Sequence, residues 1–501
     1  MTRPMNVQAE IGPKKEWAPR LAQEARLAEL DALLAHQCIG GDLIILAIER
    51  AALLGALNRH DDAKQAFISI LKQEPTHFSA LNEFATLLTR MGAIAAACRV
   101  YAEAILHHPD NPLPHINLAN LFLRANKLHE ARAHYEKALS LDSSNPHAHQ
   151  GLGAVLSDLG DRAAARGHFE KGFRDHSISS LPYRGSKPPI HVLQLVSSGG
   201  GNIPAAHLLD DNVFQTSVIV ADYLSPLVQL PPHQLVFNAI GDADLCEPAL
   251  KSAIRLLEGS KMPIINHPSA VMRTGRVANA SRLKAVPGVV TALTVSITRH
   301  VLVGLEGPAT LAGKGFRFPV LLRSAGYHTG RNFVMVRTAN ELAPVAASLP
   351  GEELLVIEFL DARRSDGAFR KYRVMMIDGR LYPLHLAISR DWKVHYFTSE
   401  MSASASHRAE EASFLGNMPG ALGSKAMAAL EAIRNTLGLD YAGVDFGLGD
   451  DGDVLLFEAN ATMIISPAGH EEHWAYRRGA VDRAIGAAIA MIEKRSGSPL
   501  P

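Results

Sequence analysis

Three oxygen-bearing side chains lie on two segments that the sequence predicts to be neighbouring strands. The apolar segments 440–447 and 453–461 flank a turn with two glycines, which is typical of an antiparallel hairpin. Asp445 lies on the first segment, while Glu458 and Asn460 lie two residues apart on the second and therefore share one face of the sheet. Oxygen donors that converge in this way are typical ligands of Mg²⁺, or of Mn²⁺, when the ion also holds nucleotide phosphates. The pattern predicts a metal site at this hairpin.

A strand that ends with a cation leads into a loop of small residues. Residues 318–324 are predicted to form a buried strand with Arg323 near its end, and the loop 325–333 contains Gly326 and Gly330. Glycine lets backbone amides approach phosphoryl oxygens, and an arginine supplies a charged bidentate donor. The loop is therefore predicted to bind phosphate, and a plain hairpin turn is the alternative if the loop is considered by itself.

Two elements between the loop and the metal hairpin carry further candidate groups. Glu358 lies near the end of the apolar strand 352–360, and backbone groups at 357–360 could bind the edge of an adenine. A second predicted hairpin, with an Asp-Gly turn, places Arg373 inside a sheet, and Lys393 follows it. A cation on a half-buried strand is costly unless it is paired, so we interpret Arg373 and Lys393 as anion ligands.

A helical repeat with a period of 34 residues occupies the first third of the chain. In four successive units, a small residue is followed four positions later by an aromatic one: Ala63, Ala97, Ala131 and Ala165, then Phe67, Tyr101, Tyr135 and Phe169. Small residues let two helices approach, and the aromatic ring fills the groove between hairpins. The spacing resembles that of tetratricopeptide (TPR) repeats. The concave face of such a solenoid can bind a peptide or protein partner, or dock against a neighbouring domain, and the sequence favours neither.

Histidines are frequent in the later repeat units, where His115 and His149 replace the tryptophan that is usual in TPR repeats. None of the seven histidines from His107 to His149 pairs with another at a metal-ligand spacing that repeats. We therefore expect these histidines on helix surfaces or between helices, and not in a metal site.

The chain changes character near residue 180. Residues 177–189 are rich in Ser, Gly and Pro, which is typical of a domain boundary. Beyond it, the apolar strand 191–196 is followed by alternating strand and helix patterns that predict an open α/β unit. The loop 197–202 contains three successive glycines but lacks the spacing of a dinucleotide-binding motif. We interpret it as a tight turn or the edge of a substrate site.

Length and composition exclude several classes of protein. The chain has 501 residues, with Lys plus Arg and Asp plus Glu balanced at 50 each, so no overall basic field favours nucleic acid as a partner. The 3 cysteines are isolated, which excludes a disulfide framework and a zinc ribbon. No run of eighteen apolar residues and no apolar leader is present. We expect a cytoplasmic protein of several domains, without a membrane span.

The region from about 190 to 495 resembles the ATP-grasp ligases, most closely the branch with the ribosomal-protein glutamate ligases, glutathione synthetase and D-alanine:D-alanine ligase. The metal signature of that family matches Asp445 followed by Glu458 and Asn460, and its flexible phosphate loop matches 324–332. Its adenine hinge matches 357–360. The chain departs from the family at two positions: Arg323 replaces the usual lysine, and Gly443 stands where the D-alanine ligases have an arginine.

The two resemblances together imply a multidomain fold class: an all-α TPR solenoid of helical hairpins, then an α/β pre-ATP-grasp domain, then an α+β ATP-grasp fold. The expected boundaries are an N-terminal segment with a leading helix at 1–43, four repeats at 44–77, 78–111, 112–145 and 146–179, a linker at 180–189, the pre-ATP-grasp domain at 190–290, the ATP-grasp domain at 291–495 and a tail at 496–501.

The ATP-grasp resemblance implies an ADP-forming ligase that joins a carboxylate to an amine through an acyl phosphate, with ATP and Mg²⁺ as cofactors. Arg373 and Lys393 would take the catalytic roles, and Asp445, Glu458 and Asn460 would hold the metal. The implied nucleotide contacts are Arg276, Arg323, Ser324, Gly326, His328, Thr329, Gly330, Ile357, Glu358, Phe359 and Leu360. The substrates would be a small acid and amine, or a peptide or protein. Two alternatives stay open: an interaction protein that binds nucleotide as a switch, and an ATP-dependent phosphotransferase.

Overall fold

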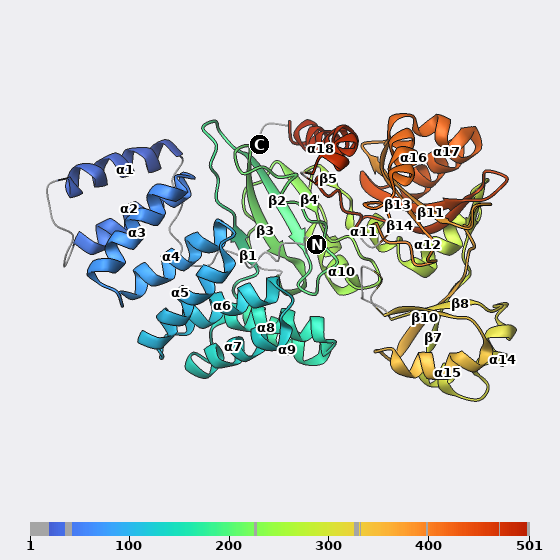
Figure 1. Cartoon of the computed structure of the whole chain (residues 1–501), viewed down its shortest axis with the longest axis horizontal. Helices are drawn as coiled ribbons and strands as arrows, with labels where there is room; N and C mark the ends of the chain where they lie inside the picture. Colours follow the sequence, from blue (N-terminus) through green and yellow to red (C-terminus); the bar gives the residue numbers. More distant parts are fainter. Residues whose placement is uncertain are drawn as a thin grey trace. The chain divides into compact units, whose positions relative to one another are not determined.

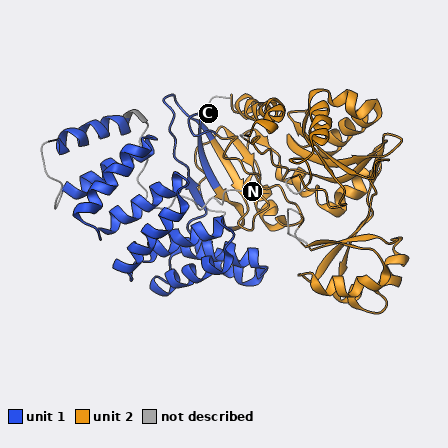
Figure 2. Ribbon diagram, in the orientation of Figure 1, with its two compact units in different colours: residues 1–191, 210–218, 223–228 blue, residues 192–209, 219–222, 229–501 orange. Residues whose placement is uncertain are grey.

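The computed structural model describes residues 20–35, 43–224, 228–324, 330, 332–396, 399–469 and 471–497 (Figure 1). The chain forms two compact units (Figure 2). Unit 1 comprises residues 1–191, 210–218 and 223–228, and unit 2 comprises residues 192–209, 219–222 and 229–501. No helix in the described part of the chain is both long and apolar enough to cross a membrane.

Unit 1 begins with helices that pair as antiparallel hairpins. They are α1 (Arg20–Leu34), α2 (Leu43–Ala56), α3 (His60–Gln73), α4 (Phe78–Arg90), α5 (Ile94–His107), α6 (Pro112–Arg124), α7 (Leu128–Leu141), α8 (Pro146–Leu159) and α9 (Arg162–Phe173). The side chains of Asn111 and Asn145 cap α6 and α8, and a proline follows each cap at the first helical position. The small and aromatic repeat positions are buried, as in Ala131 and Tyr135, so the predicted helical-hairpin repeats are confirmed.

Two histidine pairs connect the helices within the hairpins α6–α7 and α8–α9. The Nδ1 atoms of His115 and His134 lie 2.9 Å apart, and those of His149 and His168 also lie 2.9 Å apart. The expectation that these histidines lie on helix surfaces or between helices holds for His115, His134 and His149, and the pair recurs because both partners repeat after 34 residues. The Nε2 of His149 lies 3.1 Å from the carbonyl oxygen of Ser143, so this nitrogen carries the proton and Nδ1 accepts from His168.

We predict that acid loosens these two hairpins. Burial lowers the pKa of all four histidines, so the unfolded chain binds protons more tightly than the folded one. The stabilisation is complete above the unfolded pKa of about 6.5 and is lost as the pH falls below it. Hydrogen exchange of amides in α6–α9, corrected for intrinsic rates, should accelerate between about pH 7.5 and about pH 5.5.

The double variant His134→Asn, His168→Asn should remove about half of this pH dependence, because it removes two buried rings while burial still lowers the pKa of His115 and His149. The exposed His129 provides the control, so His129→Asn should leave the pH dependence unchanged. An equal acceleration in the double variant and the native chain would contradict the prediction.

The repeats are followed by a five-stranded sheet with the order β1-β3-β2-β4-β5. Its strands are β1 (Ile178–Ser180), β2 (Ile190–Val196), β3 (Phe214–Val220), β4 (Leu235–Asn238) and β5 (Ile264–Ile265). β2 is parallel to β4, and β4 is parallel to β5. The intervening and following helices are η1 (Ala221–Tyr223), α10 (Glu247–Leu256), α11 (Pro268–Met272) and α12 (Arg276–Leu283). The predicted alternation of strands and helices is therefore present.

A smaller, antiparallel sheet of four strands follows, with the order β7-β10-β8-β9. Its strands are β7 (Thr294–Thr298), β8 (Val320–Ser324), β9 (Phe333–Val336) and β10 (Glu353–Glu358). The helices α13 (Arg299–Val303), α14 (Gly307–Gly313) and α15 (Ala339–Ser348) accompany it, and Leu302, Leu311 and Leu342 share a buried core with its strands.

The third sheet has the order β12-β11-β13-β14-β6. Its strands are β6 (Val289–Thr291), β11 (Phe369–Ile377), β12 (Arg380–Ser389), β13 (Tyr441–Leu448) and β14 (Val454–Asn460), with α16 (Ala405–Gly416), α17 (Met418–Leu437), η2 (Glu472–Trp474) and α18 (Ala475–Ser496). Both predicted hairpins are confirmed. Asp378 and Gly379 turn between β11 and β12 with φ of 43° and 75°, which favours glycine.

Candidate functional site

Four strands of the third sheet align polar side chains in one row. Arg373 on β11 lies opposite His385 on β12 and also opposite Asp445 on β13, which in turn lies opposite Glu458 on β14. Directly opposed residues share a sheet face, so the prediction that Asp445 and Glu458 lie side by side is confirmed. The register shifts directly after Arg373 and after Asp445, and such irregularities are frequent beside functional sites.

Asp445 is held by two cations. The guanidinium of Arg373 donates to both carboxylate oxygens, at 2.6 and 2.8 Å, and Lys371 Nζ lies 3.2 Å from Asp445 Oδ2. Only 5% of the Asp445 side chain is exposed. Burial opposes its ionisation, but the charges of Arg373 and Lys371 outweigh burial and hold the pKa of Asp445 well below its ordinary value. Arg373, predicted to bind anions, is therefore paired with a carboxylate here.

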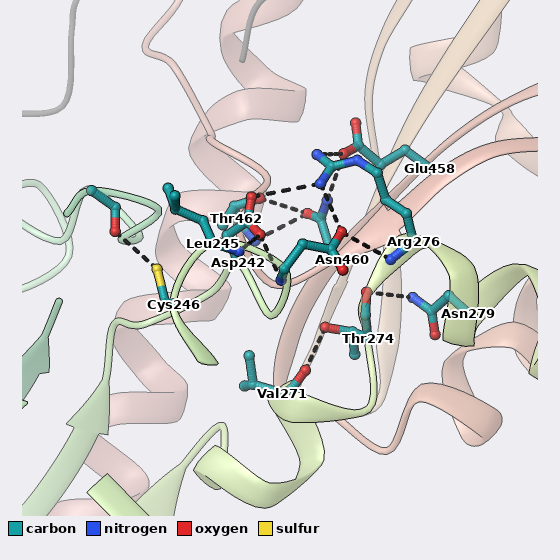
Figure 3. A network of polar contacts seen from close by, with 12 residues as sticks. Asp242, Leu245, Cys246, Val271, Thr274, Arg276, Asn279, Glu458, Asn460 and Thr462 are labelled. Carbon is teal, nitrogen blue, oxygen red and sulfur yellow. Dashed lines mark hydrogen bonds and ion pairs between the residues drawn. The ribbon is translucent and has the colours of Figure 1, made fainter. Parts of the chain in front are cut away.

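Glu458 accepts hydrogen bonds from both Arg276 and Asn460 (Figure 3). Arg276 Nη2 donates to Glu458 Oε1 at 2.9 Å, and Asn460 Nδ2 donates to the same oxygen at 2.9 Å. The amide oxygen of Asn460 accepts from the backbone and side chain of Thr462, at 3.0 and 2.9 Å. Asn460 thus presents its nitrogen, not its oxygen, to Glu458.

Arg276 lies among three carboxylates at the start of α12. Its Nη1 lies 3.0 Å from Asp244 Oδ2 and 3.7 Å from Asp242 Oδ2, and its side chain is 14% exposed. Burial would lower the pKa of Arg276, but Glu458, Asp242 and Asp244 raise it. Asp242 is itself held by the amides of Asp244 and Leu245 at 2.9 Å. Asp242 and Asp244 lie in the loop between β4 and α10, and no motif in the sequence predicts their role.

The predicted phosphate loop is described only at its ends. Gly326, His328 and Thr329 lie outside the described residues. The guanidinium of Arg323 lies 5.6 Å from the centre of the Phe333 ring, and burial, followed by Arg276, lowers its pKa. The amide of Ser324 donates to the carbonyl oxygen of Asn332 at 3.0 Å.

Lys393 reaches the far end of this loop. Its Nζ donates to the carbonyl oxygen of Phe333 at 3.0 Å. Gly330 has a φ of 72°, and a Cβ built there would lie 2.7 Å from Lys393 Cε. The structure therefore brings together Gly330 and Lys393, which the sequence analysis had placed in separate elements.

Part of the backbone of the predicted adenine hinge, residues 357–360, is used in hydrogen bonds to a neighbouring segment. The amide of Glu358 donates to the carbonyl oxygen of Leu293 at 2.8 Å, and the Leu293 amide donates to Glu358 Oε2 at 3.0 Å. The ring of Phe359 packs against Trp392 at 6.4 Å, and Phe333 packs against Trp392 at 5.4 Å. Trp392, which the sequence analysis did not single out, thus connects the hinge with the loop.

A buried carboxylate holds the segment that follows Lys393. Glu411 on α16 accepts hydrogen bonds from the hydroxyls of Tyr396 and Tyr476 and lies 3.3 Å from Arg477 Nε. Burial raises the pKa of Glu411. His385 packs against Tyr396, with ring centres 4.8 Å apart. These contacts fix one wall beside Arg373.

The first backbone amides of the glycine loop after β2 donate hydrogen bonds to nearby side chains. The amide of Ser197 donates to Asn202 Oδ1 at 2.8 Å, that of Ser198 to Asp222 Oδ2 at 2.9 Å, and that of Gly199 to Ser197 Oγ at 3.3 Å. These amides are thus engaged within unit 2, which favours the tight-turn interpretation.

The donor set suits a hard cation. Asp445 and Glu458 supply carboxylate oxygens from adjacent strands, whereas Asn460 would have to release Thr462 to offer its amide oxygen. Within the described residues, no group of three or more His, Cys, Asp or Glu side chains is arranged to hold a metal ion. A shallow pocket of about 460 Å³ in unit 2 is lined by residues including Gly379 and Leu415 and by none of the predicted site residues.

Comparisons with known proteins identify the repeats. The TPR repeat family matches residues 119–160, which span the end of α6 and the whole of α7 and α8. Similar solved structures include a double mutant of MamA RS-1 and MamA 41-end from Desulfovibrio magneticus RS-1, both 22% identical with a TM-score of 0.27. They cover 30% of this chain and 83% and 84% of their own. The Cut9-Hcn1 hetero-tetramer of APC/C also matches, with 16% identity, coverage of 30% and 28%, and a TM-score of 0.28. No curated protein matches.

Proposed function

We propose that the chain is an ATP-dependent, ADP-forming carboxylate–amine ligase on an ATP-grasp fold, with TPR repeats that recruit a protein or peptide. The observation that carries the proposal is the row of Arg373, Asp445 and Glu458 on three adjacent strands, with Arg276 contacting Glu458. A cation beside two neighbouring carboxylates on one sheet face suits a ligand that brings both phosphates and a cation. The repeats support a role in protein interaction.

The proposed reaction has two balanced steps. A carboxylate oxygen of the acid attacks the γ-phosphorus of ATP, so an acyl phosphate forms, the bond to the β-phosphate oxygen breaks and ADP leaves. The amine then attacks the acyl carbon, a C–N bond forms, phosphate leaves and the amine loses a proton. Neither step requires a nucleophile from the protein.

The residues of the chain would mainly position and neutralise charge. Asp445, Glu458 and Asn460 would hold Mg²⁺, which when bound neutralises charge on the β- and γ-phosphates. Arg323 and Arg373 would contact phosphate oxygens as charge moves, and Lys393 would hold the loop end at Phe333.

A product analysis separates the ligase from its two alternatives. Full-length protein is incubated with Mg²⁺-ATP and pools of carboxylic acids, with and without pools of amines and peptides, and ADP and mass gains are recorded. The ligase requires ADP release that depends on both pools and yields an amide. A stable phosphorylated product without amine dependence indicates a phosphotransferase, and nucleotide binding without turnover indicates a switch. Absence of nucleotide binding overturns the site itself.

We predict that Arg323→Lys retains most of the ATP affinity, while Arg323→Ala weakens it by about 1–3 kcal/mol. Lysine keeps the positive charge beside the loop but loses the planar contact with Phe333. Alanine removes a charge-assisted contact entirely. Titration calorimetry with a non-hydrolysable ATP analogue measures the difference. Equal affinities for the native chain and Arg323→Ala would place the phosphates elsewhere.

A further inference from the structure

We propose that Lys371 is a second phosphate-binding cation that occupies the metal ligand Asp445 until nucleotide arrives, so that free metal is excluded from the empty site. This inference rests on the proposed nucleotide site. It assigns a function to Lys371, which the sequence analysis did not select. The proposal is built on the position of Lys371 on its strand, its contact with Asp445, and the charges around the carboxylate row.

The strand β11 directs Lys371 toward the candidate site. Lys371 and Arg373 are two residues apart and therefore share one face of the strand. The intervening Tyr372 lies on the other face, where its ring packs against Phe414 at 5.1 Å and Phe446 at 5.3 Å. The helix α16 thus covers the Tyr372 face, and Lys371 lies on the face that carries Asp445.

Asp445 does not require Lys371 for neutralisation. The bidentate contact with Arg373 already uses both of its oxygens, and Lys371 adds a third contact at the longer distance of 3.2 Å. At Asp445 itself two cations contact one carboxylate, and 17% of the Lys371 side chain is exposed. An ammonium on a flexible stem can turn from the carboxylate to an incoming phosphate at little cost, whereas a bidentate guanidinium is less free to do so.

The second carboxylate of the row is occupied in the same way. Arg276 contacts Glu458 at 2.9 Å and is shared with Asp242 and Asp244. A divalent cation that approaches the empty row therefore meets Lys371, Arg373 and Arg276 before it meets a free carboxylate. Phosphate groups attract these cations away from Asp445 and Glu458. The carboxylate oxygens then become available to the metal.

The proposal predicts opposite changes in two affinities of the nucleotide-free and metal-free protein. In full-length Lys371→Met, the affinity for Mn²⁺ alone should rise by about tenfold, within the usual range of coupling between two sites. The affinity for a non-hydrolysable ATP analogue in the presence of a chelator should fall by a similar factor. Electron paramagnetic resonance of free Mn²⁺ and calorimetry of the analogue provide the two readouts, neither of which requires turnover.

Three further variants make the test specific. Lys371→Arg keeps the positive charge and should change both affinities less than Lys371→Met does. Lys371→Gln is the replacement if the methionine variant unfolds, since it keeps a donor toward Asp445. Lys425→Met is the matched control. Lys425 on α17 contacts Asp453 at 2.9 Å, near the turn between β13 and β14, so its loss should change neither affinity.

The outcomes distinguish this inference from the proposed function. If the native chain does not bind the analogue even with Mn²⁺, the proposed nucleotide site is wrong. If it binds the analogue, but Lys371→Met and Lys371→Gln change both affinities in the same direction or change neither, the role of Lys371 is wrong and the proposed function stands.

Discussion

Asp445→Asn is expected to lower the free energy of unfolding of unit 2 by about 3–5 kcal/mol, because it leaves Arg373 and Lys371 beside a neutral amide in a buried position. The penalty arises from two cations that have lost their partner, and not from the lost carboxylate alone. Thermal and urea unfolding of the full chain measure it. The control is Asp450→Asn on the turn of the same hairpin, whose side chain is 97% exposed and should have no measurable effect.

A second substitution should recover part of this loss. In Asp445→Asn with Lys371→Met, one unpaired cation is removed, so the double variant should be more stable than Asp445→Asn alone. A double variant that is less stable would show that Lys371 stabilises the strand by packing. An unfolding midpoint of Asp445→Asn equal to that of the native chain would show that the ion pair contributes nothing measurable.

This outcome differs from what the sequence implies for the two carboxylates. By spacing alone, Asp445 and Glu458 are equivalent metal ligands, and either amide replacement is expected to leave the fold intact. The structure makes them unequal, because 5% of the Asp445 side chain and 27% of the Glu458 side chain are exposed. How deeply a side chain is buried depends on the strands that flank its own strand. β13 lies between β11 and β14, whereas β14 lies between β13 and the short β6, so side chains on β13 are covered more completely.

The features that were predictable depend on local signals. A 34-residue period identifies the repeats because each hairpin buries the same positions against its neighbours. An Asp-Gly turn identifies the hairpin of β11 and β12, because few residues adopt positive φ at both central positions. With the turn known, the alternation of side chains along β13 and β14 is enough to place Asp445 opposite Glu458.

The features that were missed depend on contacts between distant segments. Arg276 and Glu458 are 182 residues apart, and no local pattern indicates that the start of α12 meets β14. The contacts within the histidine pairs were not predictable for a related reason. His115 and His134 lie 19 residues apart on two helices, which is not a spacing that brings ligands together on one helix. The 34-residue period relates His115 to His149 and His134 to His168, so a pair in one hairpin implies a pair in the next.

Glu458→Gln is expected to lower ATP turnover by at least about 10²-fold, the usual cost of removing one group that stabilises transferred charge. Its effect on stability should be small, at about 1 kcal/mol, because the glutamine carbonyl can still accept from Arg276 and Asn460. Turnover and unfolding are therefore separable at this position, which they are not at Asp445.

A measurement of Mn²⁺ binding then tests whether Glu458 is a metal ligand. If it holds the metal, Glu458→Gln should weaken Mn²⁺ binding in the presence of a non-hydrolysable ATP analogue, and high Mn²⁺ should restore part of the turnover. Glu431→Gln, on the surface of α17 where Glu431 pairs with Arg434, is the matched control and should change neither property. Near-native turnover of Glu458→Gln at ordinary Mg²⁺ would exclude Glu458 as a metal ligand. Its carboxylate would then serve only to hold Arg276, together with Asp242 and Asp244.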